Sequence, residues 1–227
     1  PLSPNWRLAP DGTGVRLNPH LGGGPGDASR HVKFEVVDSA KAQSKGTVSG
    51  GDATCPFSDC ARLIVGEYIK SEAHAGRMHE ELFAVAMKIR VATGKTKAGK
   101  SKEKWVRGYR SIRPEDDTSK FVANILVERL PEWEALDIVP TELVPTDIND
   151  DRPIQYGMPK WRDLFGPRQL VGHCIAVEVY RQMIDEEKAA GRWSEELAAA
   201  FVYLALSLDK MLNYNSRMSV WMSTREV

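Results

Sequence analysis

Long apolar runs are missing from this sequence, and so is the basic-then-apolar start of a signal peptide. Cysteine is scarce, with three residues in 227, which excludes a disulfide-rich secreted scaffold. Lysine plus arginine and aspartate plus glutamate each number 31, so net charge alone names no binding partner. We therefore expect a cytoplasmic protein without a membrane partner, in which cysteines bind metal or lie in the core.

Catalytic signatures are also missing. The sequence contains no Gly-x-Ser-x-Gly elbow, no His-Glu-x-x-His, no Walker loop and no paired carboxylates beside a nucleophile. The glycine-rich residues 21–26 lack the preceding hydrophobic strand and following helix that a phosphate-binding loop needs, which indicates a surface loop. We expect no complete catalytic centre within this chain.

The two ends of the sequence favour an internal segment of a longer protein. The chain begins at Pro1 rather than at methionine, and it stops at Val227 just beyond a long helical pattern. We interpret it as a fragment.

The first half of the chain predicts β-structure. Val32, Phe34 and Val36 alternate with polar neighbours, as in a half-buried strand, and residues 15–17 form a second β-prone run. Residues 1–66 are therefore expected to form a small β-rich module. In residues 67–113 we expect a helix over 67–81, strands over 82–91 and 104–112, and a long hairpin tip between them.

Residues 114–227 predict a helical region, which makes the fold class α+β. A first helix is expected to begin at residues 114–117, to bury Phe121, Ile125 and Leu126, and to end at Pro131. An acidic, proline-containing connector falls within residues 131–155. Two further helices, over 167–190 and 194–217, are expected to pair antiparallel, with Ser194 as an N-cap. Their seam is predicted at Leu197, Phe201, Leu204, Leu208 and Met211.

Cys55 and Cys60 are the sharpest local feature. Two thiolates on a short proline-containing turn can bind one tetrahedral zinc ion, although a closed site needs four ligands. The alternative is a coincidental pair, and zinc requires a second pair outside this chain. Cys174 lies in an apolar helical pattern and is interpreted as a core residue, while the neighbouring His173 is open between a polar contact and a ligand role.

The predicted hairpin concentrates positive charge. Residues 88–113 hold ten cations against the single acid Glu103, a clustering that the neutral total conceals. A lysine-rich tip can neutralise phosphates, and aromatic residues beside arginines can stack on bases or sugars. The alternative is a solvated hairpin that the acidic residues 128–151 balance. The predicted nucleic-acid-binding residues are Lys95, Lys97, Lys100, Lys102, Lys104, Trp105, Arg107 and Arg110.

Residues 156–170 (YGMPKWRDLFGPRQL) and 206–217 (LSLDKMLNYNSR) carry a wider resemblance. Together with residues 75–78 (AGRM), residues 107–110 (RGYR) and the cysteine pair, they resemble the zinc-ribbon-containing adenine-specific DNA methylases. The resemblance implies a parent enzyme that uses S-adenosylmethionine, with its glycine-rich cofactor motif upstream and its Asp-Pro-Pro-Tyr motif downstream. Neither motif is in this chain, so the segment alone is expected to be inactive.

The resemblance also implies site residues. It identifies Cys55 and Cys60 as the second half of a zinc ribbon whose first cysteine pair precedes Pro1, with Ala61 at a position that is usually glycine. Methylation of adenine in a duplex requires base flipping, so a module that binds phosphates is expected beside the catalytic domain of the same polypeptide. Further DNA contacts are expected at a loop-to-helix junction, from Lys160, Trp161, Arg162 and Arg168.

Two hypotheses follow from these residues. The first is a DNA-contacting insert of a DNA adenine-N6 methyltransferase. The second is a non-catalytic zinc-ribbon module that binds nucleic acid or protein. For Trp161, packing at a helix end is the structural alternative to a DNA contact.

Overall fold

The computed structural model describes residues 1–24, 27–95, 99, 101–146 and 150–223, without the side chain of Lys95. Within these residues the fold is mixed α+β, with small antiparallel sheets and five α-helices, in agreement with the fold class predicted from the sequence. The chain divides into two compact units. The first unit comprises Pro1–Ile69, His79–Asp116 and Trp221–Val227, and the second comprises Lys70–Met78 and Asp117–Val220.

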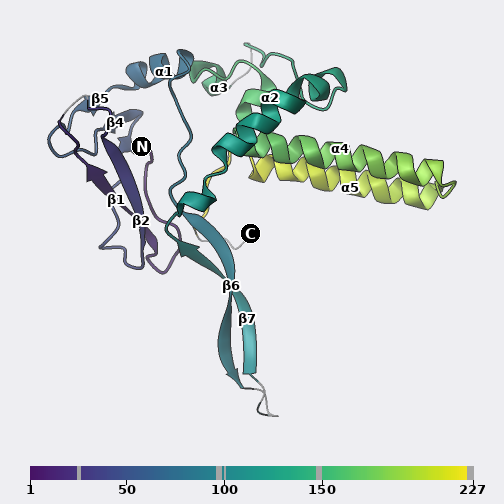
Figure 1. Ribbon diagram of the computed structural model, residues 1–227, viewed down its shortest axis with the longest axis horizontal. Helices are drawn as coiled ribbons and strands as arrows, with labels where there is room; N and C mark the ends of the chain where they lie inside the picture. The colour runs from purple at the N-terminus through teal and green to yellow at the C-terminus, as the bar shows by residue number, and fades with distance from the viewer. Residues whose placement is uncertain (25–26, 96–98, 100, 147–149, 224–227) are drawn as a thin grey trace. The chain divides into compact units, whose positions relative to one another are not determined.

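The first unit holds the strands, and Figure 1 labels all of them except the two-residue β3. They form three antiparallel sheets in the described residues, pairing β1 with β2, β4 with β3 and β5, and β6 with β7. The strands are β1 Gly14–His20, β2 His31–Val37, β3 Val48–Ser49, β4 Asp52–Thr54, β5 Leu63–Ile64, β6 Val85–Lys95 and β7 Ser101–Arg110.

The core of the first unit lies on one face of the β1–β2 pair. Val32 and Phe34 are buried while His31 and Lys33 are exposed, so the predicted alternation of this strand is confirmed. The buried cluster consists of Trp6, Leu8, Val15, Leu17, Val32 and Phe34. Tyr109 packs against this cluster from β7 and donates a hydrogen bond of 3.1 Å from its hydroxyl to the Leu8 carbonyl. The core therefore anchors the base of the β6–β7 hairpin.

The hairpin itself is paired over more of its length than the sequence predicted. The pairing continues to Lys95 opposite Ser101, with a register shift between Ala92 and Gly94. The predicted long tip over residues 93–103 is therefore wrong, because most of it forms the ends of the two strands. Residues 96–98 and 100 lie outside the described part of the chain.

The second unit is helical. A short helix α1, Gly66–His74, begins in the first unit and ends in the second, and the other helical elements follow residue 113. The first of these, η1 Pro114–Asp116, still belongs to the first unit. Those of the second unit are α2 Ser119–Ala135, α3 Arg152–Gln155, η2 Trp161–Leu164, α4 Pro167–Ala189 and α5 Glu195–Tyr214. The buried cluster of this unit consists of Val122, Trp133, Val139, Val171 and Cys174.

Two predicted helix boundaries are wrong. The helix predicted over 67–81 ends at His74, because Gly76 adopts a φ of +69° and the Arg77 N–H bonds to the Glu72 carbonyl to close the helix end. Pro131 does not end α2, which continues to Ala135. Proline removes the hydrogen bond to the carbonyl four residues earlier, and here that residue is the exposed Val127.

The predicted apolar stripe of this helix also needs correction. Residues 114–116 form the separate 3₁₀ helix η1, and Phe121 is 66% exposed. Ile125 and Leu126 do pack against the core, but the residues that α2 buries fully are Val122 and Trp133. Two of the three predicted stripe residues therefore contact the core.

The last two helices form the predicted antiparallel pair, and Figure 1 shows them side by side. The Ser194 hydroxyl accepts a hydrogen bond of 3.2 Å from the Leu197 N–H, which confirms the predicted N-cap. Tyr180 joins the pair, because its ring packs against Phe201 and its hydroxyl donates to the Phe201 carbonyl. None of the described helices combines the length and apolar character needed to cross a membrane.

Candidate nucleic-acid and metal-binding sites

Residues 55–60, here called the cysteine turn, connect β4 to β5. The Cys55 N–H bonds to the Arg62 carbonyl at 3.0 Å, and the N–H groups of Cys60 and Ala61 both bond to the Phe57 carbonyl. These bonds fold the six residues so that the two thiols lie close enough to influence each other's ionisation. The structure therefore brings together the two cysteines that the sequence predicted as metal ligands.

Backbone N–H groups also point at the two sulfur atoms. The Phe57 N–H bonds to Cys55, and the Arg62 N–H bonds to Cys60. Burial raises the pKa of the Cys55 thiol, whereas the Arg62 N–H lowers the pKa of the exposed Cys60 thiol. Each sulfur thus has a donor two residues further on. The donor favours the thiolate at Cys60, whereas burial outweighs it at Cys55.

Arg30 fixes the cysteine turn to the β1–β2 sheet. Its guanidinium makes two hydrogen bonds of 2.7 Å to the Asp59 carboxylate and lies 4.3 Å from the centre of the Phe57 ring. The Arg30 side chain is 10% exposed, so this contact is largely shielded from water. No local sequence pattern indicates a role for Arg30 here, because Arg30 and Asp59 are 29 positions apart.

The cysteine turn fits half of a zinc site. Across the described ranges, no group of three or more histidine, cysteine, aspartate or glutamate side chains is placed to hold a metal ion. A closed tetrahedral site needs two ligands beyond Cys55 and Cys60. Cys174 does not supply one, because it is buried in the core of the second unit, where burial raises its pKa to about 11. Its predicted core role is confirmed.

Ala61 adopts a backbone conformation that favours glycine, with a φ of +45°. We predict that Ala61→Gly stabilises the first unit by about 0.5–1 kcal/mol, since relief of strain exceeds the added entropy of the unfolded chain. Chemical denaturation measures the change. Ala86→Gly, at an exposed position in β6, is the matched control and is expected to destabilise by about 0.5–1 kcal/mol. Equal losses for the two variants would disprove the strain at Ala61.

The β6–β7 hairpin presents different residues on its two faces. Lys88 lies opposite Arg107 and Arg90 opposite Trp105, and directly opposite residues share a face of a sheet. Ile89, opposite Val106, belongs to the other face. Every second residue of a strand lies on the same face, so Lys104 and Lys102 share this other face with Val106 in β7 and lie nearer the tip. The ribbon therefore carries cations on both faces.

Three lysines of the hairpin are free of carboxylate partners. Within the described chain, no ion pair involves Lys88, Lys102 or Lys104, and all three are exposed. Trp105 is 60% exposed, and the Arg90 guanidinium lies 5.0 Å from its ring centre while also pairing with Glu103 at 3.3 Å. Lys97 and Lys100 lie outside the described residues, as does the side chain of Lys95. The described part thus offers three free charges and one exposed aromatic ring.

The arginines at the base of the hairpin have partners in the first unit. Arg107 lies over the Trp221 ring, at 5.3 Å from its centre, and lines a cleft of about 660 Å³ together with Arg16 and Glu35. Arg110 makes two hydrogen bonds of 2.6 Å to Asp116. Arg110 therefore holds the hairpin base, and its predicted DNA contact would have to compete with a carboxylate.

The Arg110–Asp116 pair predicts a pH dependence. Arg110 lowers the pKa of Asp116 from 3.8, its value in the unfolded chain, to about 2 in the folded protein. The ion pair therefore stabilises the folded state fully at pH values above 3.8, and this stabilisation is lost as the pH falls from 3.8 to about 2. We predict that Asp116→Asn makes the protein less stable at neutral pH and flattens the loss of stability between about pH 4 and 2. Thermal melts across this range test it. Asp150→Asn, which removes an exposed pair with Arg152, is the control, and an equal effect would contradict a special role for Asp116.

The remaining predicted DNA contacts lie in the second unit, around η2 and the start of α4. Arg162 forms an ion pair with Glu134, whereas Arg168 and Trp161 are exposed and Lys160 is half-buried. In the described structure Arg168 has no carboxylate partner, so it is the freest cation of this group.

The two long stretches that carry the family resemblance meet in the second unit. The Arg217 N–H bonds to the Leu164 carbonyl at 2.7 Å, and its guanidinium bonds to the Asp163 carbonyl. His173 bonds through Nε2 to the Asn215 carbonyl and packs against Phe165, which gives it a structural partner. Residues 156–170 and 206–217 thus form one structural patch.

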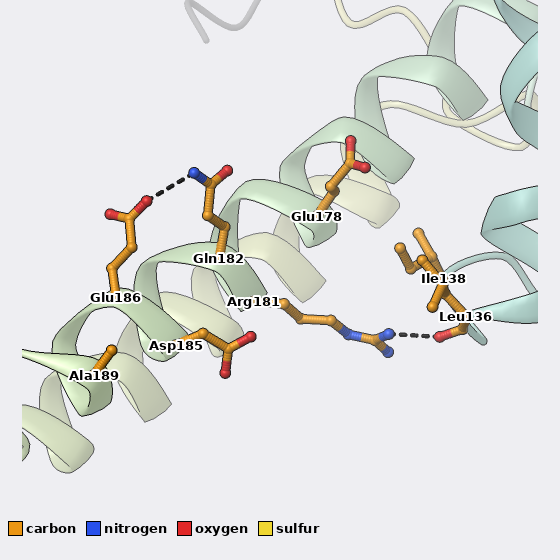
Figure 2. Close-up of a pocket in the computed structure, with 8 residues that line it drawn as sticks. All are labelled: Leu136, Ile138, Glu178, Arg181, Gln182, Asp185, Glu186 and Ala189. Atoms are coloured by element: carbon orange, nitrogen blue, oxygen red, sulfur yellow. Dashed lines mark hydrogen bonds between the residues drawn. The ribbon is translucent and has the colours of Figure 1, made fainter.

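A groove lies between the end of α2 and α4, and charged side chains of α4 form part of its lining (Figure 2). Its volume is about 530 Å³. Arg181 donates to the carbonyls of Leu136 and Asp137, and Gln182 donates to Glu186. Arg181 thus satisfies two carbonyls that follow the end of α2.

Comparisons with known proteins give no family for the chain. No family model matches it, and neither does a curated protein or a solved structure.

Proposed function

We propose that this chain is the DNA-contacting insert of an S-adenosylmethionine-dependent DNA adenine-N6 methyltransferase. The observation that supports the proposal best is the β6–β7 hairpin, a two-stranded ribbon with free lysines on both faces and an exposed tryptophan. The major groove of DNA admits a two-stranded ribbon, and cations on both faces can contact the two phosphate strands that border a groove.

In this proposal the catalytic domain of the same polypeptide binds S-adenosylmethionine and transfers the methyl group. The hairpin supplies affinity and register by contacting phosphates, while the target base is flipped out elsewhere. Cys55 and Cys60 would supply two ligands of a structural zinc ion, which would hold the cysteine turn rigid when bound. Arg30 docks that turn on the sheet through its two hydrogen bonds to Asp59.

A salt titration of duplex binding tests the DNA contact. We expect the chain to bind a labelled duplex of roughly 30 bp, with log K falling against log salt at a slope of about −3 to −4 if three or four hairpin cations neutralise phosphates. Fluorescence anisotropy measures the binding. A slope near zero, or no binding at low salt, would contradict the proposal.

A zinc-ribbon interaction module is the second candidate, and the docked cysteine turn is the observation that favours it. The two candidates differ in what surrounds the chain. A methyltransferase insert requires a glycine-rich cofactor motif upstream and an Asp-Pro-Pro-Tyr motif downstream in the same reading frame. Sequencing of the flanking reading frame distinguishes them, and the absence of both motifs would rule out the methyltransferase.

A further inference from the structure

Helix α5 is largely apolar around its whole circumference over about three turns that follow its acidic first turn. Residues 197–208 contain no charged side chain. One side of this segment packs on α4, where Phe201 is buried against Tyr180 and Trp193. A helix that is hydrophobic all round is normally buried on every side.

The side of α5 that faces away from α4 is exposed, however. At about 100° per residue, Val202, Tyr203 and Leu206 lie on the side opposite Phe201. Their exposed fractions are 58%, 73% and 57%. With the exposed Ala199 they form what we call the outward face of α5.

Charges of opposite sign border this outward face. Glu196, Ala199, Tyr203, Leu206 and Lys210 follow one another at spacings of three and four residues, as in a coiled-coil seam. The seam thus begins with an acid and ends with a base, and Tyr203 is its midpoint. Both charged residues are exposed.

We propose that the outward face of α5 binds a second copy of this chain, with the two α5 helices antiparallel about a twofold axis near Tyr203. The charges select this arrangement. Antiparallel pairing places Glu196 of each copy beside Lys210 of the other, at both ends of the contact, whereas parallel pairing places like charges together. The apolar residues between these ends then cover one another.

This interface is small, because each copy contributes one short helical face. We expect a dissociation constant on the order of 10 µM, which is typical of contacts at the low end of interface size. The inference concerns a different surface from the hairpin and does not depend on the proposed DNA function.

Sedimentation equilibrium of the whole chain, from about 1 to about 200 µM, tests the dimer. The wild type is expected to change from monomer to dimer over this range. Leu206→Glu is expected to raise the dissociation constant at least tenfold, because it buries a charge at the centre of the contact. Phe121→Glu, on an exposed residue of α2, is the matched control and is expected to leave the constant unchanged.

A charge exchange tests the antiparallel arrangement. Glu196→Lys and Lys210→Glu are each expected to weaken self-association, because each places like charges together at both ends. An equimolar mixture of the two variants is expected to restore the dimer, since the mixed pair has opposite charges at both ends. A monomeric wild type, a dimer that Leu206→Glu leaves intact, or a mixture that stays monomeric would overturn the proposal.

Discussion

Replacing Lys88, Lys102 and Lys104 together with glutamate is expected to weaken duplex binding by about 100- to 1000-fold at physiological salt. Each lysine that neutralises a phosphate releases a condensed counterion, and charge reversal adds repulsion. The same change should make the log K against log salt slope shallower by about 2.7, or 0.9 for each lost phosphate contact. Anisotropy titrations at several salt concentrations measure both quantities.

The matched control reverses Lys33, Lys41 and Lys45, which are exposed lysines of the same unit outside the hairpin. Its change in net charge is identical, so it reports the general effect of charge on DNA binding. We expect a loss of less than about tenfold. A control that weakens binding as strongly as the hairpin variant would show that the location of the lysines is irrelevant.

Trp133→Ala is expected to destabilise the second unit by about 3–5 kcal/mol, the range for removing a large aromatic side chain from a core. Trp133 is fully buried at the centre of that core, and the Arg129 guanidinium lies 5.3 Å from its ring centre. Urea denaturation followed by helical circular dichroism measures the loss, because the long helices belong to this unit.

Trp161→Ala provides the comparison for Trp133. Trp161 is exposed, so its removal is expected to cost less than about 1 kcal/mol. Similar losses for the two variants would contradict the assignment of Trp133 to the core. A large loss at Trp161 alone would favour helix-end packing over a DNA contact for that residue.

Local patterns predicted β1, β2 and the last two helices well, whereas β3, β4 and β5 were not predicted. The alternation at Val32 and Phe34 is a property of neighbouring residues, and so is the cap at Ser194. The boundaries that failed depend on the surroundings instead. Pro131 is tolerated because α2 exposes the residue that loses its hydrogen bond, and the hairpin tip pairs because an opposite strand is present.

The candidate sites show the same limit. The cysteine pair is visible in the sequence because its two members are close together. Arg30 holds the cysteine turn by bonding to Asp59, and it cannot be recognised from the sequence because it lies 29 positions before Asp59. The sequence also predicted DNA-binding arginines without showing which carboxylates pair with them. Arg110 and Arg162 belong to the predicted DNA-binding set, yet the structure pairs them with Asp116 and Glu134. A composition count cannot separate such arginines from the free Lys102 and Lys104.

The contact between the hairpin and DNA is the central claim, and crosslinking tests it most directly. A photoreactive phenylalanine analogue at position 105 would replace the exposed tryptophan of the ribbon, and the same analogue at position 121 would occupy an exposed site on α2. We predict that light attaches a labelled duplex to the chain at position 105 and leaves position 121 unlabelled. Absence of crosslinking at 105 in the presence of binding, or equal crosslinking at both positions, would contradict the assignment of the hairpin as the DNA-contacting element.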